Sequence, residues 1–202
     1  ASGRFLAKAA GVVCGWPVVE EVFRQLNPEI ELKIERPDGD RVNPGDLLAV
    51  ITGPARDLLS GERVALNFLQ HLSGVATATR RLVDLIAAFP RVRLVDTRKT
   101  IPGLRALQKY AVRVGGGHNH RFNLADAVLI KDNHLAACGG IQAAIAKVRA
   151  AAPHTMKIEV EVESEQQVRE ALAAGADIIM LDNMSPSMMA EMVRLIDGRA
   201  LV

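Results

Sequence analysis

The sequence predicts an α/β protein in which a small α/β sandwich domain is followed by an open, TIM-like α/β barrel. Residues 1–57 contain short strand-like stretches around one helix, and residues 58–90 are dominantly helical. From residue 91 onward, short apolar strands alternate with helices. This alternation is typical of βαβ units and of a parallel sheet that is buried on both faces. We therefore expect the sandwich domain over 1–57, a helical connection over 58–90 and a partial barrel over 91–202.

The first 57 residues combine strand patterns, turn signals and one helix start. The alternation over 30–34 is typical of a half-buried strand, and Pro17 suits the first turn of a helix. The stretch 38–46 with the strand after it resembles small biotinyl and lipoyl domains, but no carrier lysine stands at the hairpin tip, which excludes a swinging arm. The expected elements are a strand over 9–15 with glycine bends, a helix over 18–26, strands over 30–34 and 46–51, and a turn over 37–40.

A long helix is expected over 58–89, where apolar residues recur at helical spacing. Ser73 and Gly74 predict an interruption within it, and Pro90 predicts its end.

The following segment predicts five strands and three intervening helices. A closed eight-stranded barrel typically needs about 250 residues, so five strands indicate an open sheet or, as we expect, a piece of a longer chain. The predicted strands cover 92–95, 127–130, 158–162, 178–181 and 200–202, and the helices cover 141–152, 165–174 and 186–196.

The composition indicates a folded and soluble protein. The 202 residues are 49 % hydrophobic and 24 % charged, which excludes a disordered chain. A net charge of +2 and 3 % aromatic residues argue against nucleic-acid and membrane-surface binding. No apolar run approaches the roughly 20 residues of a membrane span, and no secretory signal is recognised. Cys14 and Cys138 stand far apart without metal-binding spacing, so we expect no disulfide and a cytoplasmic location.

Polar clusters coincide with the predicted barrel strands, mostly where these strands end. Ligands of parallel α/β folds bind at the carboxyl ends of the strands, so these side chains are candidates for one site. A single cluster is equally typical of a solvated loop, and the three alternating glutamates would also suit a strand with one wet face. The clusters are Asp96–Thr100, Lys131–His134, the glutamates at 159, 161 and 163, and Asp182–Asn183.

Cations outnumber acids among these candidates, which favours an anionic ligand such as a carboxylate or a phosphate. The acids are expected to pair with a lysine or to stabilise a positive charge that develops on a substrate. The cations are Arg98, Lys99, His120, Arg121 and Lys131, and the acids are Glu161 and Asp182.

Other motifs give weaker signals. The three glycines at 115–117 could present backbone amides to a phosphate, but their spacing matches no known phosphate loop. His118 and His120 could share a metal, yet no third ligand stands at a useful spacing, which disfavours zinc. Neither cysteine has a histidine base nearby in the sequence, and no nucleophile elbow is present.

Several long motifs, taken together and in order, resemble the quinolinate phosphoribosyltransferase family over essentially the whole chain. The motifs are ERVALN at 62–67, HLSGVAT at 71–77, DTRKTIPGLR at 96–105, KY at 109–110, GGG at 115–117, NHR at 119–121, IKDNH at 130–134, EVEVE at 159–163 and LDN at 181–183.

The resemblance implies the Mg²⁺-assisted reaction of quinolinate with 5-phosphoribosyl 1-diphosphate, which yields nicotinate mononucleotide, diphosphate and CO₂ in NAD biosynthesis. It implies a homodimer or a hexamer with shared active sites. It assigns dicarboxylate binding to Arg98, His120 and Arg121, with Arg63 from the other subunit and Thr97 also on the substrate side. It further assigns Lys99 and Lys131 to phosphate oxygens, and Glu161 and Asp182 to the ribose or to Mg²⁺.

Members of the family extend beyond this sequence on both sides and carry a later Ser-Gly-Gly phosphate loop, so we expect weak binding of the 5-phosphate here. A related phosphoribosyltransferase for another base, such as nicotinate, remains an alternative, although residues 119–121 with Arg98 favour a ligand with two carboxylates. A non-catalytic anion-binding dimer scaffold is a second alternative.

Overall fold

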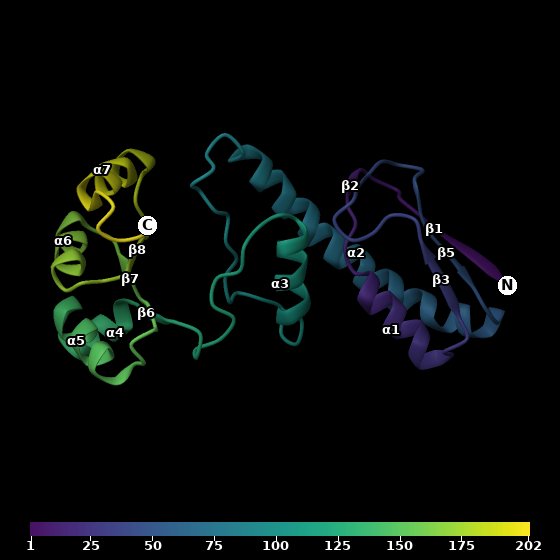
Figure 1. Ribbon diagram of the computed structural model, residues 1–202, viewed down its shortest axis with the longest axis horizontal. Helices are drawn as coiled ribbons and strands as arrows, with labels where there is room; N and C mark the ends of the chain where they lie inside the picture. Colours follow the sequence, from purple (N-terminus) through teal and green to yellow (C-terminus); the bar gives the residue numbers. More distant parts are fainter. The chain divides into compact units, whose positions relative to one another are not determined.

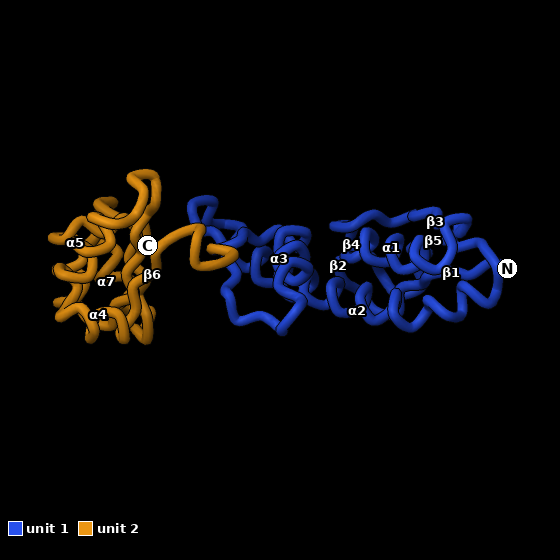
Figure 2. The backbone as a smooth tube through the Cα atoms, turned by 90° about the horizontal axis from the view of Figure 1, so that it is seen from below, with its two compact units in different colours: residues 1–120 blue, residues 121–202 orange.

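The computed structural model describes residues 1–202 and divides them into two compact units, 1–120 and 121–202 (Figure 2). This division groups residues by their contacts, and the domain boundaries expected at residues 57 and 90 stay a prediction. None of the helices combines the length and the apolar character that a membrane crossing requires.

The first unit begins with two small antiparallel sheets. β1 (Ser2–Leu6), β5 (Leu47–Thr52) and β3 (Glu31–Ile34) form one sheet in the order β1-β5-β3. β2 (Gly11–Val12) and β4 (Arg41–Val42) form the other. The strands expected over 30–34 and 46–51 are confirmed. Of the strand expected over 9–15, only β2 forms, and β1 was not predicted.

Helix α1 (Trp16–Leu26) confirms the predicted helix over 18–26, and its apolar face packs with side chains of the first sheet (Figure 1). Its buried side chains include Trp16, Val19 and Phe23, which join Phe5 in one apolar cluster. The rings of Phe5 and Trp16 meet edge to face, with centroids 5.5 Å apart. This cluster is therefore the core of the sandwich, in which α1 and the sheet bury their apolar faces together.

Helix α2 (Ala55–Leu85) runs for 31 residues without the interruption expected at Ser73–Gly74. The Ser73 hydroxyl accepts a hydrogen bond from the Cys14 amide at 2.9 Å and donates to the Cys14 carbonyl. One turn later, the Thr77 hydroxyl accepts from the Val12 amide, also at 2.9 Å. Ser73, one of the two residues that suggested a break, and Thr77 thus bind the backbone of residues 12–14 from an intact helix.

Helix α3 (Arg105–Val114) was not predicted and packs against α2. Ala111 of α3 is buried with Val12, Cys14, Leu72 and Ala76 in a separate small cluster. The strand expected over 92–95 is wrong: only Val95 forms a bridge, to His118, while Val92 and Val95 remain about half exposed. Within this unit no neighbouring strand completes the backbone hydrogen bonds that an extended segment needs.

The second unit is a parallel α/β layer. β6 (Val128–Ile130), β7 (Ile158–Val162) and β8 (Ile178–Leu181) form a sheet in that order. The helices are α4 (Asp132–Cys138), α5 (Ile141–Ala151), α6 (Glu165–Ala173) and α7 (Pro186–Ile196). These elements confirm the predicted strands and helices of this segment, apart from α4, which was not predicted. Residues 200–202 form no strand, and Leu201 makes a single bridge to Ile178.

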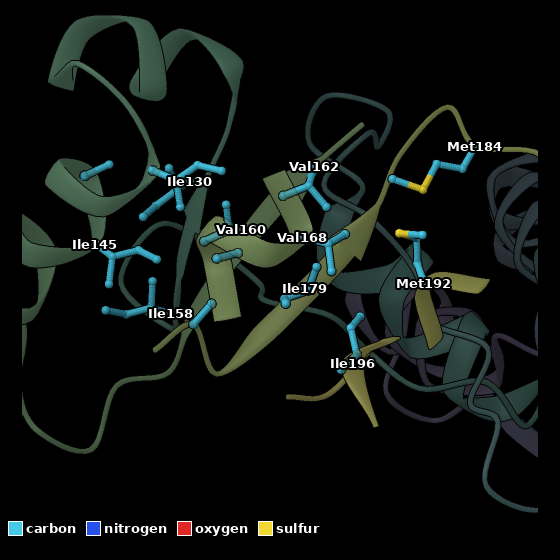
Figure 3. Packing of buried hydrophobic residues seen from close by; sticks show 14 residues of the cluster. Ile130, Ile145, Ile158, Val160, Val162, Val168, Ile179, Met184, Met192 and Ile196 are labelled. Atoms are coloured by element: carbon cyan, nitrogen blue, oxygen red, sulfur yellow. The ribbon is translucent and has the colours of Figure 1, made fainter. Parts of the chain in front are cut away.

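Alternation along the sheet separates an apolar face from a polar one. Ile158, Val160 and Val162 are fully buried and pack with helical side chains such as Ile145, Val168 and Ile196 (Figure 3). Because strand side chains alternate between faces, Glu159 and Glu161 lie on the opposite face. That face carries the candidate residues of this unit.

Candidate functional site

The candidate cations of the first unit lie on a loop, residues 96–101, that helix α3 holds in place. Arg105 Nε donates a hydrogen bond to Thr100 Oγ1 at 3.1 Å, and its guanidinium also reaches the Arg98 carbonyl. Gln108 Oε1 accepts from the Ile101 amide at 3.0 Å. The loop therefore has a defined shape although it contains no regular secondary structure.

Arg98 and Lys99 carry charges that no carboxylate within residues 1–120 neutralises. Arg98 is half-buried and Lys99 is exposed, and their side chains form no hydrogen bond or ion pair. Thr97 shapes the turn between them, because its hydroxyl accepts a hydrogen bond from the Lys99 amide at 3.0 Å. Two unpaired cations on a fixed loop are suited to an anionic ligand, and arginine offers a planar fork to a carboxylate.

His120 is brought to the same loop by Asp96. The His120 amide donates a hydrogen bond to Asp96 Oδ1 at 2.9 Å, while Lys109 Nζ donates to the His120 carbonyl at 3.1 Å. Asp96, which was not among the predicted site residues, thus connects two residues that were, Arg98 and His120. Arg121 belongs to the second unit, where its guanidinium donates to the Ala127 carbonyl at 3.3 Å.

Lys131 and Glu161 form an ion pair at the carboxyl end of the parallel strands. The parallel register pairs Ile130 with Val160, which places the next residues, Lys131 and Glu161, side by side on the polar face. The Lys131 amide donates to His134 Nδ1 at 2.9 Å, so His134 fixes the backbone at the start of α4. The Lys131 side chain is 43 % exposed, which leaves its ammonium accessible to a ligand.

Asp182 follows β8 and lies beside the end of β7, where its amide donates to the Val162 carbonyl at 2.9 Å. Asn183 links two acids, since its side-chain amide donates to Asp182 Oδ2 at 2.9 Å and to Glu163 Oε1 at 3.0 Å. Glu159, further down the same strand face, is 5 % exposed. The expected grouping of Lys131, Glu161 and Asp182 at one sheet edge is therefore found within the second unit.

The acids of this edge suit Mg²⁺ only together with ligands from a substrate. No group of three or more His, Cys, Asp or Glu side chains in residues 1–202 is arranged to hold a metal. Mg²⁺ is commonly held by one or two carboxylates plus substrate phosphates. Glu161, near the end of β7, and Asp182, directly after the neighbouring β8, fit that donor set.

The three glycines at 115–117 serve packing and bind no phosphate through their amides. Each amide already donates within the chain, to the carbonyls of Ala111, Arg113 and Val112 in order. A Cβ on Gly115 would stand 2.5 Å from the Ala76 carbonyl oxygen of α2. The glycines therefore let the end of α3 approach α2, and the suggestion of an amide cradle for phosphate is wrong.

This close approach predicts that Gly115→Ala destabilises the protein. Its φ of −69° is open to alanine, so the contact with α2 alone should lower the free energy of unfolding by about 1–3 kcal/mol. Gly74→Ala is the matched control, because that position lies in α2 with open space around it and should gain about 0.5–1 kcal/mol. Urea unfolding of the two variants measures both effects. Equal stability of both variants would contradict the packing role.

Two further groups are shown to be structural. Burial and the nearby Asp38 raise the pKa of the Cys14 thiol to about 12, which suppresses the thiolate that a nucleophile needs. Burial, together with a hydrogen bond to Asp38, raises the pKa of Tyr110 above its ordinary value. Asp38 also accepts from the Gly15 and Trp16 amides at the start of α1, so it ties α1 to α3.

Sequence reasoning overlooked Lys109 as a separate candidate. A lysine within a helix usually indicates a solvated surface, yet this side chain is 2 % exposed. Arg63, in contrast, lies exposed on α2.

Comparisons with known proteins give one consistent family. Residues 1–73 match the model for the N-terminal domain of quinolinate phosphoribosyl transferase, and residues 75–202 match that for its C-terminal domain. The "Probable nicotinate-nucleotide pyrophosphorylase [carboxylating]" of Bacillus subtilis is 50 % identical over 190 residues, which are 94 % of this chain and 65 % of that protein. The human "Nicotinate-nucleotide pyrophosphorylase [carboxylating]" is 42 % identical over 89 % of this chain.

Solved structures confirm the predicted fold class. The crystal structure of NadC from Streptococcus pyogenes superimposes with a TM-score of 0.94 at 51 % identity, covering 99 % of this chain and 70 % of that one. The nicotinate-nucleotide pyrophosphorylase from Francisella tularensis gives 0.95 at 40 % identity, covering 98 % and 70 %. The chain spans 65 % of the Bacillus subtilis protein and 60 % of the human protein that it matches.

Proposed function

The chain belongs to the quinolinate phosphoribosyltransferase family, and we propose that the protein transfers phosphoribosyl from 5-phosphoribosyl 1-diphosphate to quinolinate with loss of CO₂. The products are nicotinate mononucleotide and diphosphate, which makes the protein a pentosyltransferase of NAD biosynthesis. The observation that carries this proposal is the pair of unneutralised cations, Arg98 and Lys99, on a loop that is fixed beside His120.

Quinolinate is a planar dicarboxylate, and the cations suit it. The Arg98 guanidinium can donate two parallel hydrogen bonds to one carboxylate. His120 and Arg121 are assigned to dicarboxylate binding as well, with Thr97 on the substrate side, and Lys99 is assigned to a phosphate oxygen. Nicotinate, which has one carboxylate, would leave part of this positive charge unpaired, and that difference favours quinolinate.

The second unit supplies groups for the sugar donor. The Lys131 ammonium is placed to hold a phosphate or diphosphate oxygen and to stabilise negative charge as the diphosphate leaves. Glu161 and Asp182 can accept hydrogen bonds from ribose hydroxyls and stabilise positive charge at the anomeric carbon. These two carboxylates would also hold Mg²⁺, which when bound neutralises charge on the diphosphate.

The bond changes balance without an enzyme nucleophile. The ring nitrogen of quinolinate bonds to the anomeric carbon as diphosphate departs. The carboxylate next to the quaternised nitrogen then leaves as CO₂, and a proton replaces it on the ring carbon. The residues of this chain orient the two substrates and exchange no covalent bond with them, so positioning and charge account for their role.

We further propose a cytoplasmic homodimer, or a hexamer built from such dimers, in which Arg63 of the partner subunit contributes to quinolinate binding. The exposure of Arg63 on α2 supports this, as do the exposed apolar side chains Leu59 and Val64 next to it. The two cysteines form no disulfide, which suits a reducing compartment.

The test is an assay of the full-length protein with each base. With the phosphoribosyl donor and Mg²⁺, quinolinate should give nicotinate mononucleotide and one CO₂ per turnover, while nicotinate should give no product. Product from nicotinate would instead establish a related phosphoribosyltransferase. Calorimetric binding of quinolinate without any turnover would leave an anion-binding scaffold.

A further inference from the structure

We propose that Lys109 and Asp96 are positioning residues for quinolinate: their buried ion pair holds the loop with Arg98 and Lys99 in register with His120. This inference rests on the proposed function and adds two residues that touch no substrate. Lys109 Nζ lies 2.5 Å from Asp96 Oδ1, with side-chain exposures of 2 % and 9 %.

Asp96 accepts the hydrogen bonds that hold this arrangement together. Its Oδ1 accepts from Lys109 and from the His120 amide, and its Oδ2 accepts from Asn119 Nδ2 at 2.6 Å. Its own amide donates to the His118 carbonyl at 3.1 Å. The carboxylate therefore connects the segment before Arg98 with Asn119 and His120, and the Asp96 amide connects it with His118.

Lys109, on α3, also binds the His120 segment. Its ammonium donates to the His120 carbonyl at 3.1 Å as well as to Asp96, and its own carbonyl accepts from Asn119 Nδ2 at 3.0 Å. The amide and the carbonyl of His120 are thus both fixed by the pair. Arg98 stands two residues from Asp96, so a change at the pair shifts the cation loop relative to His120.

The burial of the pair points to a purpose other than stability. A buried ion pair is costly to desolvate, and well-packed apolar side chains in its place are often no less stable. What an apolar pair cannot supply is the set of directional hydrogen bonds to both segments. A displacement of about 1 Å in substrate-positioning groups can cost about a hundredfold in rate.

The experiment compares Lys109→Met, Asp96→Asn and the double variant in the full-length enzyme. Lys109→Met leaves the Asp96 carboxylate buried without its partner, and Tm should fall by about 10 °C. The KM for quinolinate should rise at least about tenfold, and it should rise more than the KM for the phosphoribosyl donor, because the loop contributes only Lys99 to that substrate. The double variant removes both charges and should recover at least half of the lost Tm. Its quinolinate KM should remain raised, because a methionine side chain at position 109 donates no hydrogen bond to the His120 carbonyl.

Tyr110→Phe is the matched control on the neighbouring residue of α3. It removes the 2.7 Å hydrogen bond to Asp38 and should lower Tm without changing the quinolinate KM.

A quinolinate KM of Lys109→Met within threefold of wild type would overturn the positioning role. Recovery of both Tm and KM in the double variant would overturn it too, since a merely structural pair predicts that result. A wild-type protein that releases no CO₂ from quinolinate would refute the proposed function itself, whereas an active wild type with unaffected variants refutes this inference alone.

Discussion

Lys131→Ala is expected to lower kcat by about two to three orders of magnitude, the cost typical of losing one preorganised group that stabilises transition-state charge. The ammonium stands at the carboxyl end of β6 and is positioned by Glu161. In the proposed reaction, its removal takes away one of the positive charges that stabilise the departing diphosphate. Steady-state kinetics with saturating quinolinate and phosphoribosyl donor measures the effect.

The loss should come from chemistry and not from unfolding. The Lys131 side chain is 43 % exposed and that of Glu161 is 17 % exposed, so the pair is only partly buried, and its loss should destabilise the fold far less than loss of the buried Lys109–Asp96 pair. Tm should therefore change little. Lys147→Ala, at an exposed lysine of α5 in the same unit, serves as the control and should retain full activity. A kcat of Lys131→Ala within threefold of wild type would exclude Lys131 from the reaction.

Arg98→Ala is expected to raise the KM for quinolinate about ten- to a hundredfold, because hydrogen bonds to a charged group contribute about 1.5–3 kcal/mol. The KM for the phosphoribosyl donor should change by less than about threefold. No carboxylate of the structure depends on the Arg98 side chain, so its loss should leave the fold intact. Initial rates measured while each substrate is varied separate the two constants.

Arg98→Lys tests whether geometry or charge alone matters at this position. Lysine keeps the charge and loses the planar fork, so the quinolinate KM should remain well above that of wild type. Arg91→Ala, at an exposed arginine earlier in the same connecting segment, is the control and should leave both constants unchanged. Equal effects of Arg98→Ala on both substrates would contradict its assignment to the dicarboxylate.

The sequence predicted the second unit well because that unit depends on local periodicity. The apolar strand 178–181, the alternating strand 158–162 and the helices between them bury their apolar faces against one another, so pattern and structure agree. β1 was missed because Ser2–Leu6 lacks a strong apolar alternation and is extended mainly through its pairing with β5. The strand expected over 92–95 was wrong because its apolar residues, although typical of a strand, have no neighbouring strand with which to pair.

The candidate residues could be proposed from their place at strand ends, whereas the contacts that hold them could not be predicted from the sequence. Lys131 and Glu161 follow or occupy strands that the structure contains, which is a signal visible in the sequence. Arg98 was selected from its place after 92–95, a predicted strand that does not form. The contact of Lys109 with Asp96 joins residues that are 13 positions apart. It depends on how α3 packs, and no sequence period reports that packing.

The hydroxyls of Ser73 and Thr77 have a consequence for aggregation. The amides of Val12 and Cys14, at and just beyond β2, would otherwise be open donors, and open strand edges invite pairing with another chain. A helix that offers two oxygens one turn apart blocks this edge without adding a strand. Residues 12–14 are buried, and their amides stay paired with α2 only while it remains helical there, so local unfolding of α2 would open them to pairing with another chain.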